Sequence, residues 1–146
     1  VFDNKHVMAE IICDGIHIHP ATIRATFRMM GADRMILISD SIRATGMPDG
    51  QYTLGGQDVK VVGKRATLGN TDTIAGSATN LMDCMRTAVK QMGLPLEVGC
   101  ATINPARSLD IDDQYGSIEA GKKAHVVLLD KELNLTAVIK DGVRIC

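Results

Sequence analysis

The alternation of apolar and polar positions predicts a strand, a helix and a second strand near the start of the chain. Met35–Ile38 is an unbroken apolar run, which is typical of a parallel strand buried on both faces. Residues 9–13, Ala-Glu-Ile-Ile-Cys, also read as a short strand. Between them, apolar residues recur at helical spacing in a segment that begins at Pro20 and ends before Gly31. Residues 9–39 are therefore predicted to form one strand–helix–strand unit.

Three short apolar runs, separated by turns, come next. These runs are residues 51–54, 57–62 and 65–68. The pairs Gly55-Gly56 and Gly63-Lys64 between them suit tight hairpins, so residues 49–68 predict a β meander inserted before the next helix. Residues 69–77 are expected to form a loop of small residues, whose free backbone N–H groups suit an anion or a carbonyl.

The most clearly patterned helix of the chain is expected to follow, with Ser77 as its cap and Gly93 as its end. One of its faces is apolar and carries Leu81, Met85, Ala88 and Met92. Pro95 is predicted to begin a further helix that reaches about residue 101. Asn104 is predicted to cap a short helix that ends near Leu109.

Short strands are expected to make up the end of the chain. They are residues 124–129, 133–139 and 143–146. Three short strands are marginally stable alone. We therefore expect this tail, residues 110–146, to dock on segments outside the chain.

Composition excludes several classes of protein. The chain has 146 residues, a net charge of −1, 3% aromatic residues and no basic cluster, which argues against a nucleic-acid partner. No apolar run approaches the roughly 20 residues of a membrane span. The four cysteines show no zinc spacing, and we interpret them as reduced, mostly buried thiols of a cytoplasmic protein. The start at Val1 resembles the middle of a longer protein, so we expect a fragment.

Polar residues follow both predicted strands of the first unit. Asp40 comes directly after the second strand, where α/β proteins place their chemistry. The residue types leave two interpretations open: an Asp that caps a turn, or a catalytic carboxylate. After the first strand, His17 and His19 share one side if the strand continues through them. They are candidates for a metal site, although a pair of hydrogen-bonding histidines is the more common outcome.

Several motifs, taken together and in order, resemble the C-terminal part of the N-acetylglucosamine-6-phosphate deacetylase family of the amidohydrolase superfamily. They are Asp14-Gly15-Ile16-His17-Ile18-His19-Pro20, Ile38-Ser39-Asp40-Ser41, Asp49-Gly50-Gln51-Tyr52, Thr73-Ile74-Ala75-Gly76-Ser77, Asn104-Pro105-Ala106-Arg107 and the closing segment from Gly116 to Val127. The resemblance covers essentially the whole chain. It implies an α/β fold in which residues 1–109 supply the last strands and helices of a (β/α)₈ barrel, and residues 110–146 supply strands of a small β-sandwich domain.

The resemblance also implies which residues carry the chemistry. Asp40 matches the catalytic acid/base, and His17 matches the histidine that binds the acetyl carbonyl. Two segments match substrate-binding loops: Asp14, Gly15 and Ile16 in the first, and Ile74, Ala75 and Gly76 in the second. The family's divalent metal ion, zinc or iron, has its main ligands on earlier strands. We therefore expect no certain metal ligand in this chain, with Asp40 a possible one.

The implied activity is hydrolysis of N-acetylglucosamine 6-phosphate to glucosamine 6-phosphate and acetate, in amino-sugar catabolism. The implied partners are the amino-sugar phosphate, the remainder of the parent chain and a second copy in a homodimer. Two alternatives remain. One is a non-catalytic fragment with a binding or interaction role, and the other is a relative acting on a different N-acyl sugar or a cyclic amide.

Overall fold

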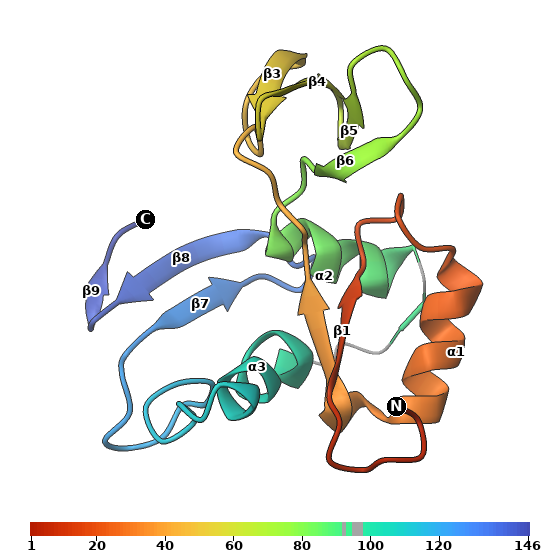
Figure 1. Ribbon diagram of the computed structural model, residues 1–146. Helices are drawn as coiled ribbons and strands as arrows, with labels where there is room; N and C mark the ends of the chain where they lie inside the picture. Colours follow the sequence, from red (N-terminus) through yellow and green to blue (C-terminus); the bar gives the residue numbers. More distant parts are fainter. Residues whose placement is uncertain (92, 95–97) are drawn as a thin grey trace.

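The computed structural model describes residues 1–91, 93, 94 and 98–146, which form a mixed α/β structure (Figure 1). The first half contains β1 (Ala9–Ile12), α1 (Pro20–Met30), the 3₁₀ helix η1 (Ala32–Arg34), β2 (Met35–Ile38), β3 (Gly50–Leu54), β4 (Gln57–Val62), β5 (Arg65–Leu68) and β6 (Ile74–Ser77). The second half contains α2 (Leu81–Lys90), the 3₁₀ helix η2 (Val98–Ala101), α3 (Ile103–Ser108), β7 (Val126–Leu129), β8 (Leu135–Lys140) and β9 (Val143–Arg144).

The predicted strand–helix–strand unit is confirmed. Strands β1 and β2 pair in parallel, in a register that runs from Ala9 opposite Met35 to Ile12 opposite Ile38. Helix α1 connects them, and Figure 1 shows α2 crossing behind the pair. The main core lies between these elements and η2, and it consists of Ile11, Cys13, Ile23, Met30, Met35, Leu37, Cys84, Met85, Ala88 and Cys100.

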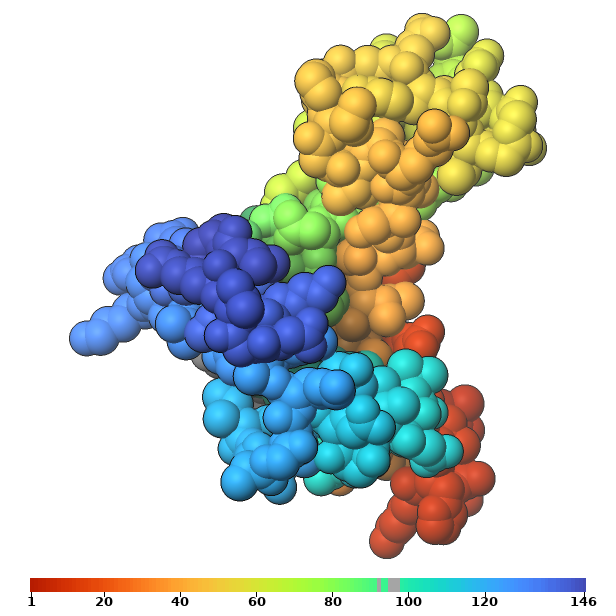
Figure 2. Space-filling model, turned by 90° about the vertical axis from the view of Figure 1, so that its left-hand side faces the viewer, coloured from red at the N-terminus to blue at the C-terminus, as the bar shows by residue number. Residues whose placement is uncertain are grey.

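The meander is present, and it gains a fourth strand that the sequence did not predict. The antiparallel sheet has the order β3-β4-β5-β6, so part of the expected loop over residues 69–77 is strand β6. This sheet has a small core of its own, built on Val59, Val61, Ala66 and Ala44. Figures 1 and 2 show the sheet projecting from the rest of the molecule, at the top of both views.

Two of the expected helix caps are wrong. The side chain of Asn80, not Ser77, caps α2 by accepting a hydrogen bond from the Asp83 backbone N–H. Helix α2 ends at Lys90 rather than at Gly93. Met92, expected on the apolar face of this helix, and Pro95, expected to begin the next one, lie outside the described residues.

Asn104 is the second wrong cap, because α3 begins two residues earlier than expected, at Ile103, and Thr102 occupies the cap position. Asn104 is buried instead, and its Nδ2 donates hydrogen bonds to the carbonyl oxygens of Ala32 and Met35, both at 2.7 Å. A buried amide that bridges two backbone carbonyls satisfies groups that would otherwise be desolvated without partners. Asn104 therefore secures the start of β2 rather than a helix end.

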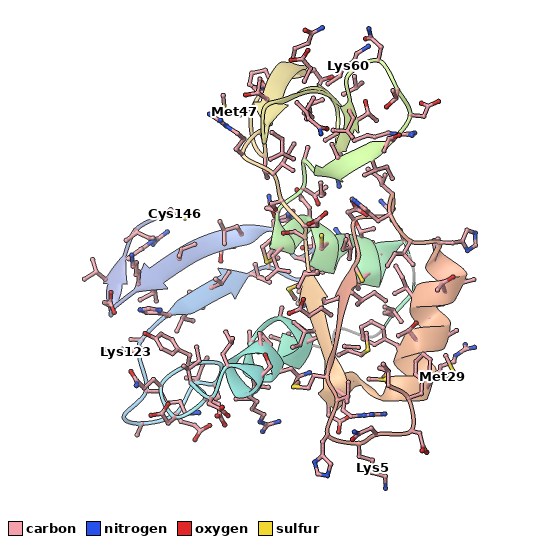
Figure 3. All side chains as sticks on the ribbon, in the orientation of Figure 1. Lys5, Met29, Met47, Lys60, Lys123 and Cys146 are labelled. Atoms are coloured by element: carbon pink, nitrogen blue, oxygen red, sulfur yellow. The ribbon has the colours of Figure 1, made fainter. Side chains whose placement is uncertain are left out.

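The expected tail strands form a separate antiparallel sheet with the order β7-β8-β9. Figure 3 shows this sheet extending toward Cys146, well away from Met29 on the outer side of α1. Several of its apolar side chains are exposed, namely Val127, Leu128, Leu135 and Val143. Docking of this tail on segments outside the chain stays a prediction.

The cysteines are free thiols, as the spacing predicted, and three of them are buried. Burial raises the pKa of the Cys13 thiol to about 12, and it raises the pKa of Cys84 as well. Both groups are therefore neutral fillers of the main core. No helix in the described part of the chain has the length and apolar character needed to cross a membrane.

Candidate functional site

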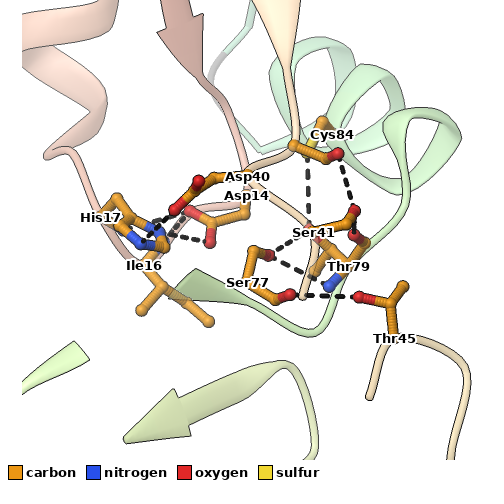
Figure 4. A network of polar contacts seen from close by, with 10 residues as sticks. Asp14, Ile16, His17, Asp40, Ser41, Thr45, Ser77, Thr79 and Cys84 are labelled. Carbon is orange, nitrogen blue, oxygen red and sulfur yellow. Dashed lines mark hydrogen bonds and ion pairs between the residues drawn. The ribbon is translucent and has the colours of Figure 1, made fainter. Parts of the chain in front are cut away.

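The carboxyl ends of β1 and β2 bring Asp14, His17 and Asp40 together (Figure 4). Adjacent parallel strands end at the same edge of a sheet, so residues that follow them become neighbours in space although they are far apart in sequence. This edge is where polar side chains of α/β proteins meet a ligand.

Asp14 organises the turn that follows β1. Its side chain is fully buried, and Oδ1 accepts hydrogen bonds from the backbone N–H groups of Ile16 at 2.9 Å and His17 at 3.1 Å. Burial alone would raise the pKa of this carboxyl, but the two backbone donors and the His17 ring outweigh it and hold the pKa below its ordinary value. Asp14 is therefore an ionised carboxylate that fixes the backbone of its own loop.

The same carboxylate orients the ring of His17. Asp14 Oδ2 lies 2.7 Å from His17 Nδ1, so Nδ1–H donates to it. The other ring nitrogen, Nε2, faces Asp40 Oδ2 at 3.7 Å. His17 is mostly buried whereas the Asp40 side chain is 53% exposed, so Nε2 and the Asp40 carboxylate meet at the open side of the site.

Gly15 completes this loop, and its conformation explains the residue type. It has a φ of +83°, and a Cβ there would lie 3.2 Å from the Thr87 side chain of α2. Glycine is the residue that accepts such a conformation without strain. Asp14, Gly15, Ile16 and His17 thus form one tight turn, with α2 packed directly behind Gly15.

His19 does not join this group. Strand β1 ends at Ile12, so His17 and His19 do not share the side of a strand. His19 caps α1, and its Nδ1 accepts a hydrogen bond from the Ala21 backbone N–H at 3.2 Å. The hydrogen-bonding alternative for the two histidines is the one that the structure contains.

Asp40 occupies a strained backbone position. Its φ is +54°, in the left-handed region that few residues other than glycine adopt, although Asp tolerates it better than most. Its carbonyl oxygen accepts a hydrogen bond from the Ser77 backbone N–H at 2.8 Å. In the described structure its carboxylate faces the His17 ring and caps no helix.

Of the three residues predicted on the second binding loop, Gly76 contacts Asp40. A Cβ at Gly76 would lie 2.6 Å from the Ile42 side chain, 3.3 Å from the Asp40 carbonyl oxygen and 3.5 Å from Asp40 Oδ2, and φ is +112°. Ile74 pairs with Thr67 of β5, and Ala75 packs against the small core of the projecting sheet. Substrate contacts by Ile74, Ala75 and Gly76 stay a prediction.

A group of buried hydroxyls beside Asp40 was missed by sequence reasoning. Ser77 and Thr79 are almost fully buried, and their Oγ and Oγ1 atoms lie 2.6 Å apart. Ser41 Oγ donates to the Thr79 carbonyl oxygen (Figure 4). Nothing in the pattern of small residues from 75 to 80 distinguishes a buried hydroxyl from an exposed one, and the contact of Ser41 with Thr79 joins residues 38 positions apart.

The described residues do not form a complete metal site of their own. Within the part that the structure describes, no three His, Cys, Asp or Glu side chains are arranged to hold a metal ion. A bound zinc ion typically has three or four protein ligands. A role of the half-exposed Asp40 carboxylate as one such ligand stays a prediction.

A cavity lies away from this site. It has a volume of about 380 Å³, on the projecting sheet, and its lining consists of Lys60, Val62, Arg65, Thr67, Gly69, Asn70, Thr71 and Asp72. Figure 3 shows Lys60 at the outer end of that sheet. Arg65 is already paired there, with its guanidinium donating to the Asp72 carbonyl oxygen at 3.1 Å.

The fold and the site define an α/β protein with acid/base groups at the ends of parallel strands. Residues 4–145 match the sequence model of the amidohydrolase family. The chain belongs to the amidohydrolase family, whose members are generally metal-dependent.

Within the family, the chain is similar in sequence to named deacetylases. The chain is 39% identical over 134 residues to N-acetylglucosamine-6-phosphate deacetylase of Vibrio furnissii, which covers 90% of this chain and 33% of the relative. It is 37% identical over 143 residues to a putative N-acetylgalactosamine-6-phosphate deacetylase of Escherichia coli strain K12, which covers 95% of this chain and 83% of the relative. The resemblance found in the sequence is thereby confirmed.

A solved structure agrees. A mutant N-acetyl-D-glucosamine-6-phosphate deacetylase of Mycobacterium smegmatis, in complex with N-acetyl-D-glucosamine-6-phosphate, superposes with a TM-score of 0.88 at 38% identity. The match covers 98% of this chain and 39% of that protein. The chain thus spans about a third of the length of the first curated relatives that it matches.

Replacement of Gly76 by Ala should cost more stability than replacement of a glycine in open space. Gly56→Ala is the matched control, because its φ is +80° and a Cβ there meets nothing within 4 Å. The control should lose about 1–2 kcal/mol from backbone strain alone. Gly76→Ala should lose a further 1–3 kcal/mol or so, because its Cβ overlaps Ile42. Urea unfolding of the full-length protein measures the difference, and equal losses would contradict the close approach.

Asp14→Asn should make stability less dependent on pH in the acid range. Ionised Asp14 stabilises the native state above its ordinary pKa of 3.8, and this stabilisation is lost as pH falls through that value toward the lower pKa of the folded state. Wild type should exceed the variant by about 1–3 kcal/mol at neutral pH. The gap should narrow below about pH 4.

Urea unfolding midpoints of the full-length protein, measured across this pH range, test the prediction. Asp113→Asn, at an exposed carboxylate, is the control and should change little. A wild-type advantage that is the same at neutral and acid pH would show that the Asp14 charge contributes nothing.

Proposed function

We propose that the protein carrying this chain is a metal-dependent deacetylase that hydrolyses N-acetylglucosamine 6-phosphate to glucosamine 6-phosphate and acetate, in amino-sugar catabolism. The observation that carries the proposal is the group of Asp40, His17 and Asp14 at the ends of two parallel strands. The named relatives give the substrate class, since they are deacetylases of 6-phosphorylated N-acetyl amino sugars.

His17 would bind the acetyl carbonyl of the substrate through Nε2. Because Nδ1–H is directed at the buried Asp14 carboxylate, the ring can donate from Nε2 only as an imidazolium. A donor aimed at the oxygen on which negative charge develops stabilises the transition state more than the ground state.

Asp40 would serve as the general base and then as the general acid. Amide hydrolysis requires removal of a proton from the attacking water and delivery of a proton to the leaving nitrogen. Asp40 lies on the same open side as His17 Nε2, and its carboxylate is half-exposed to incoming water and substrate. The sugar phosphate would lie between two segments of the chain. The first is the loop of Asp14, Gly15 and Ile16, and the second is the part of β6 that contains Ile74, Ala75 and Gly76.

The divalent metal ion, zinc or iron, would be held mainly by residues beyond those of this chain, with Asp40 contributing at most one ligand. Residues 1–109 would supply the last strands of a (β/α)₈ barrel with the inserted sheet, and residues 110–146 strands of a β-sandwich. The two-stranded β1–β2 sheet and the exposed apolar side chains of the tail support this arrangement. We further propose a cytoplasmic homodimer.

N-acetylgalactosamine 6-phosphate is the second candidate substrate. The relative from Escherichia coli strain K12 that carries this sugar in its name matches 83% of its own length. Acetate release from both sugar phosphates by the purified, metal-loaded full-length protein distinguishes the two. Release from neither would support a binding role without chemistry.

Asp40→Asn should lower kcat by about 10³–10⁴-fold with KM changed little, because the variant removes the proton acceptor and keeps the shape. Asn also tolerates the left-handed backbone at this position. The control is Asp110→Asn, since Asp110 has a φ of +55° and is exposed on the segment after α3. Acetate release by the full-length protein is the measurement. Activity of Asp40→Asn within a few-fold of wild type would remove Asp40 from the mechanism.

His17→Asn should lower kcat/KM by about 10²-fold, which is less than the loss at Asp40, because it removes one stabilising donor and leaves the proton transfer in place. His19→Asn is the matched control, since His19 caps α1 and lies outside the site. It should retain nearly full activity. Equal rates for His17→Asn and wild type would show that the His17 ring serves only to hold its loop.

A further inference from the structure

We propose that Ser77 and Thr79 are positioning residues, which hold the Asp40 backbone in its left-handed conformation and so keep the carboxylate facing His17. The proposal rests on the proposed role of Asp40. We call the side chains of Ser41, Ser77 and Thr79, with the backbone of Ser77, the hydroxyl clamp.

The backbone of Ser77 contacts the chain on both sides of Ser41. Its N–H donates to the Asp40 carbonyl oxygen at 2.8 Å, and its carbonyl oxygen accepts from the Ile42 N–H at 2.9 Å. Together these bonds form an isolated parallel bridge between Ser41 and Ser77. Thr45 Oγ1 donates to the same Ser77 carbonyl at 3.1 Å. The end of β6 thus holds the segment that carries Asp40.

The hydroxyls hold Ser77 in turn. Ser77 Oγ accepts from the Thr79 backbone N–H at 3.0 Å and lies 2.6 Å from Thr79 Oγ1. Ser41 Oγ donates to the Thr79 carbonyl oxygen at 2.5 Å. Figure 4 shows these contacts as a continuous network next to Asp40, with Cys84 behind Thr79.

Because the network is buried, each of its hydrogen bonds depends on a protein partner. Ser77 is 0% and Thr79 is 1% exposed, so water cannot replace a lost partner. Loss of the Thr79 hydroxyl therefore removes one of the two hydrogen bonds of the buried Ser77 Oγ, which keeps the bond from the Thr79 backbone N–H and gains no water in place of the other. A strained backbone conformation persists only where its surroundings determine it from several directions. Asp40, with a φ of +54°, has that support from Ser77 on one side and from the close approach of Gly76 on the other.

Thr79 offers the sharpest test, because two substitutions of similar size separate the hydroxyl from the methyl group. Thr79→Val removes the hydroxyl, whereas Thr79→Ser keeps it. Thr136→Val is the control for loss of a threonine hydroxyl elsewhere, since Thr136 Oγ1 donates to the Leu128 carbonyl oxygen on the tail sheet. Ser41→Ala is a milder variant at an exposed position, in case Thr79→Val does not fold.

In the full-length protein, Thr79→Val should lower kcat about tenfold with KM within twofold of wild type. Thr79→Ser and Thr136→Val should stay near wild type, and Ser41→Ala should lose kcat several-fold. In an Asp40→Asn background, Thr79→Val should have no further effect, because the carboxylate that it positions is already absent. An equal loss in both backgrounds, or an equal loss in Thr79→Ser, would overturn the proposal.

Amide hydrogen exchange supplies a measurement that needs no activity. The Ser77 and Ile42 amides, which form the bridge, should exchange at least tenfold faster in Thr79→Val than in wild type and Thr79→Ser, while the amides of β4 stay unchanged. Faster exchange at both amides in a protein that releases no acetate would support the hydroxyl clamp and contradict the proposed deacetylase activity. Acetate release with unchanged exchange at both amides would reject the clamp and retain the deacetylase.

Discussion

The register of two parallel strands is the constraint on which the rest of the site depends. Ile12 lies opposite Ile38 in the last pair, so Asp14 and Asp40 each follow by two residues and reach the same edge. Asp14 is buried and binds backbone, whereas Asp40 is half-exposed, and His17 lies between the two carboxylates. A slip of one position in this pairing would turn every side chain to the opposite face and separate the two carboxylates.

Sequence reasoning succeeded where one local signal dominated. The apolar run of β2 and the Pro20 and Gly31 boundaries of α1 specify their elements without tertiary help, and Asp40 follows the run so directly that its position was predictable. It failed where signals competed. Ser77, Thr79 and Asn80 are all suitable helix caps, and β6 is a strand because β5 pairs with it rather than because of its composition. The contacts of Ser77 with Asp40 join segments that no local pattern connects.

The two sides of the proposed site are held by different kinds of polar contact. On the β1 side, an ionised carboxylate orients a ring, and the strength of that contact changes with pH. On the β2 side, neutral hydroxyls and backbone groups hold the Asp40 segment, and their contacts do not titrate in the ordinary range. Protonation of Asp14 would therefore weaken the contact that orients His17, while the groups that hold the Asp40 backbone would keep their contacts.

The inserted sheet leaves the strand ends at β2 and returns to them at β6, and this path divides its surface into two kinds of position. The turn at Gly55-Gly56 is open, with nothing within 4 Å of a Cβ placed there, whereas the turn at Gly63-Lys64 is held by Asp49, which accepts from the Gly63 N–H, and by the Ala78 N–H, which donates to the Lys64 carbonyl oxygen. The returning end at Gly76 and Ser77 is closely packed against Asp40. For protein engineering, the turn at Gly55-Gly56 is accordingly the natural point to graft a fluorescent reporter or an affinity tag, and the return segment is the one to leave intact.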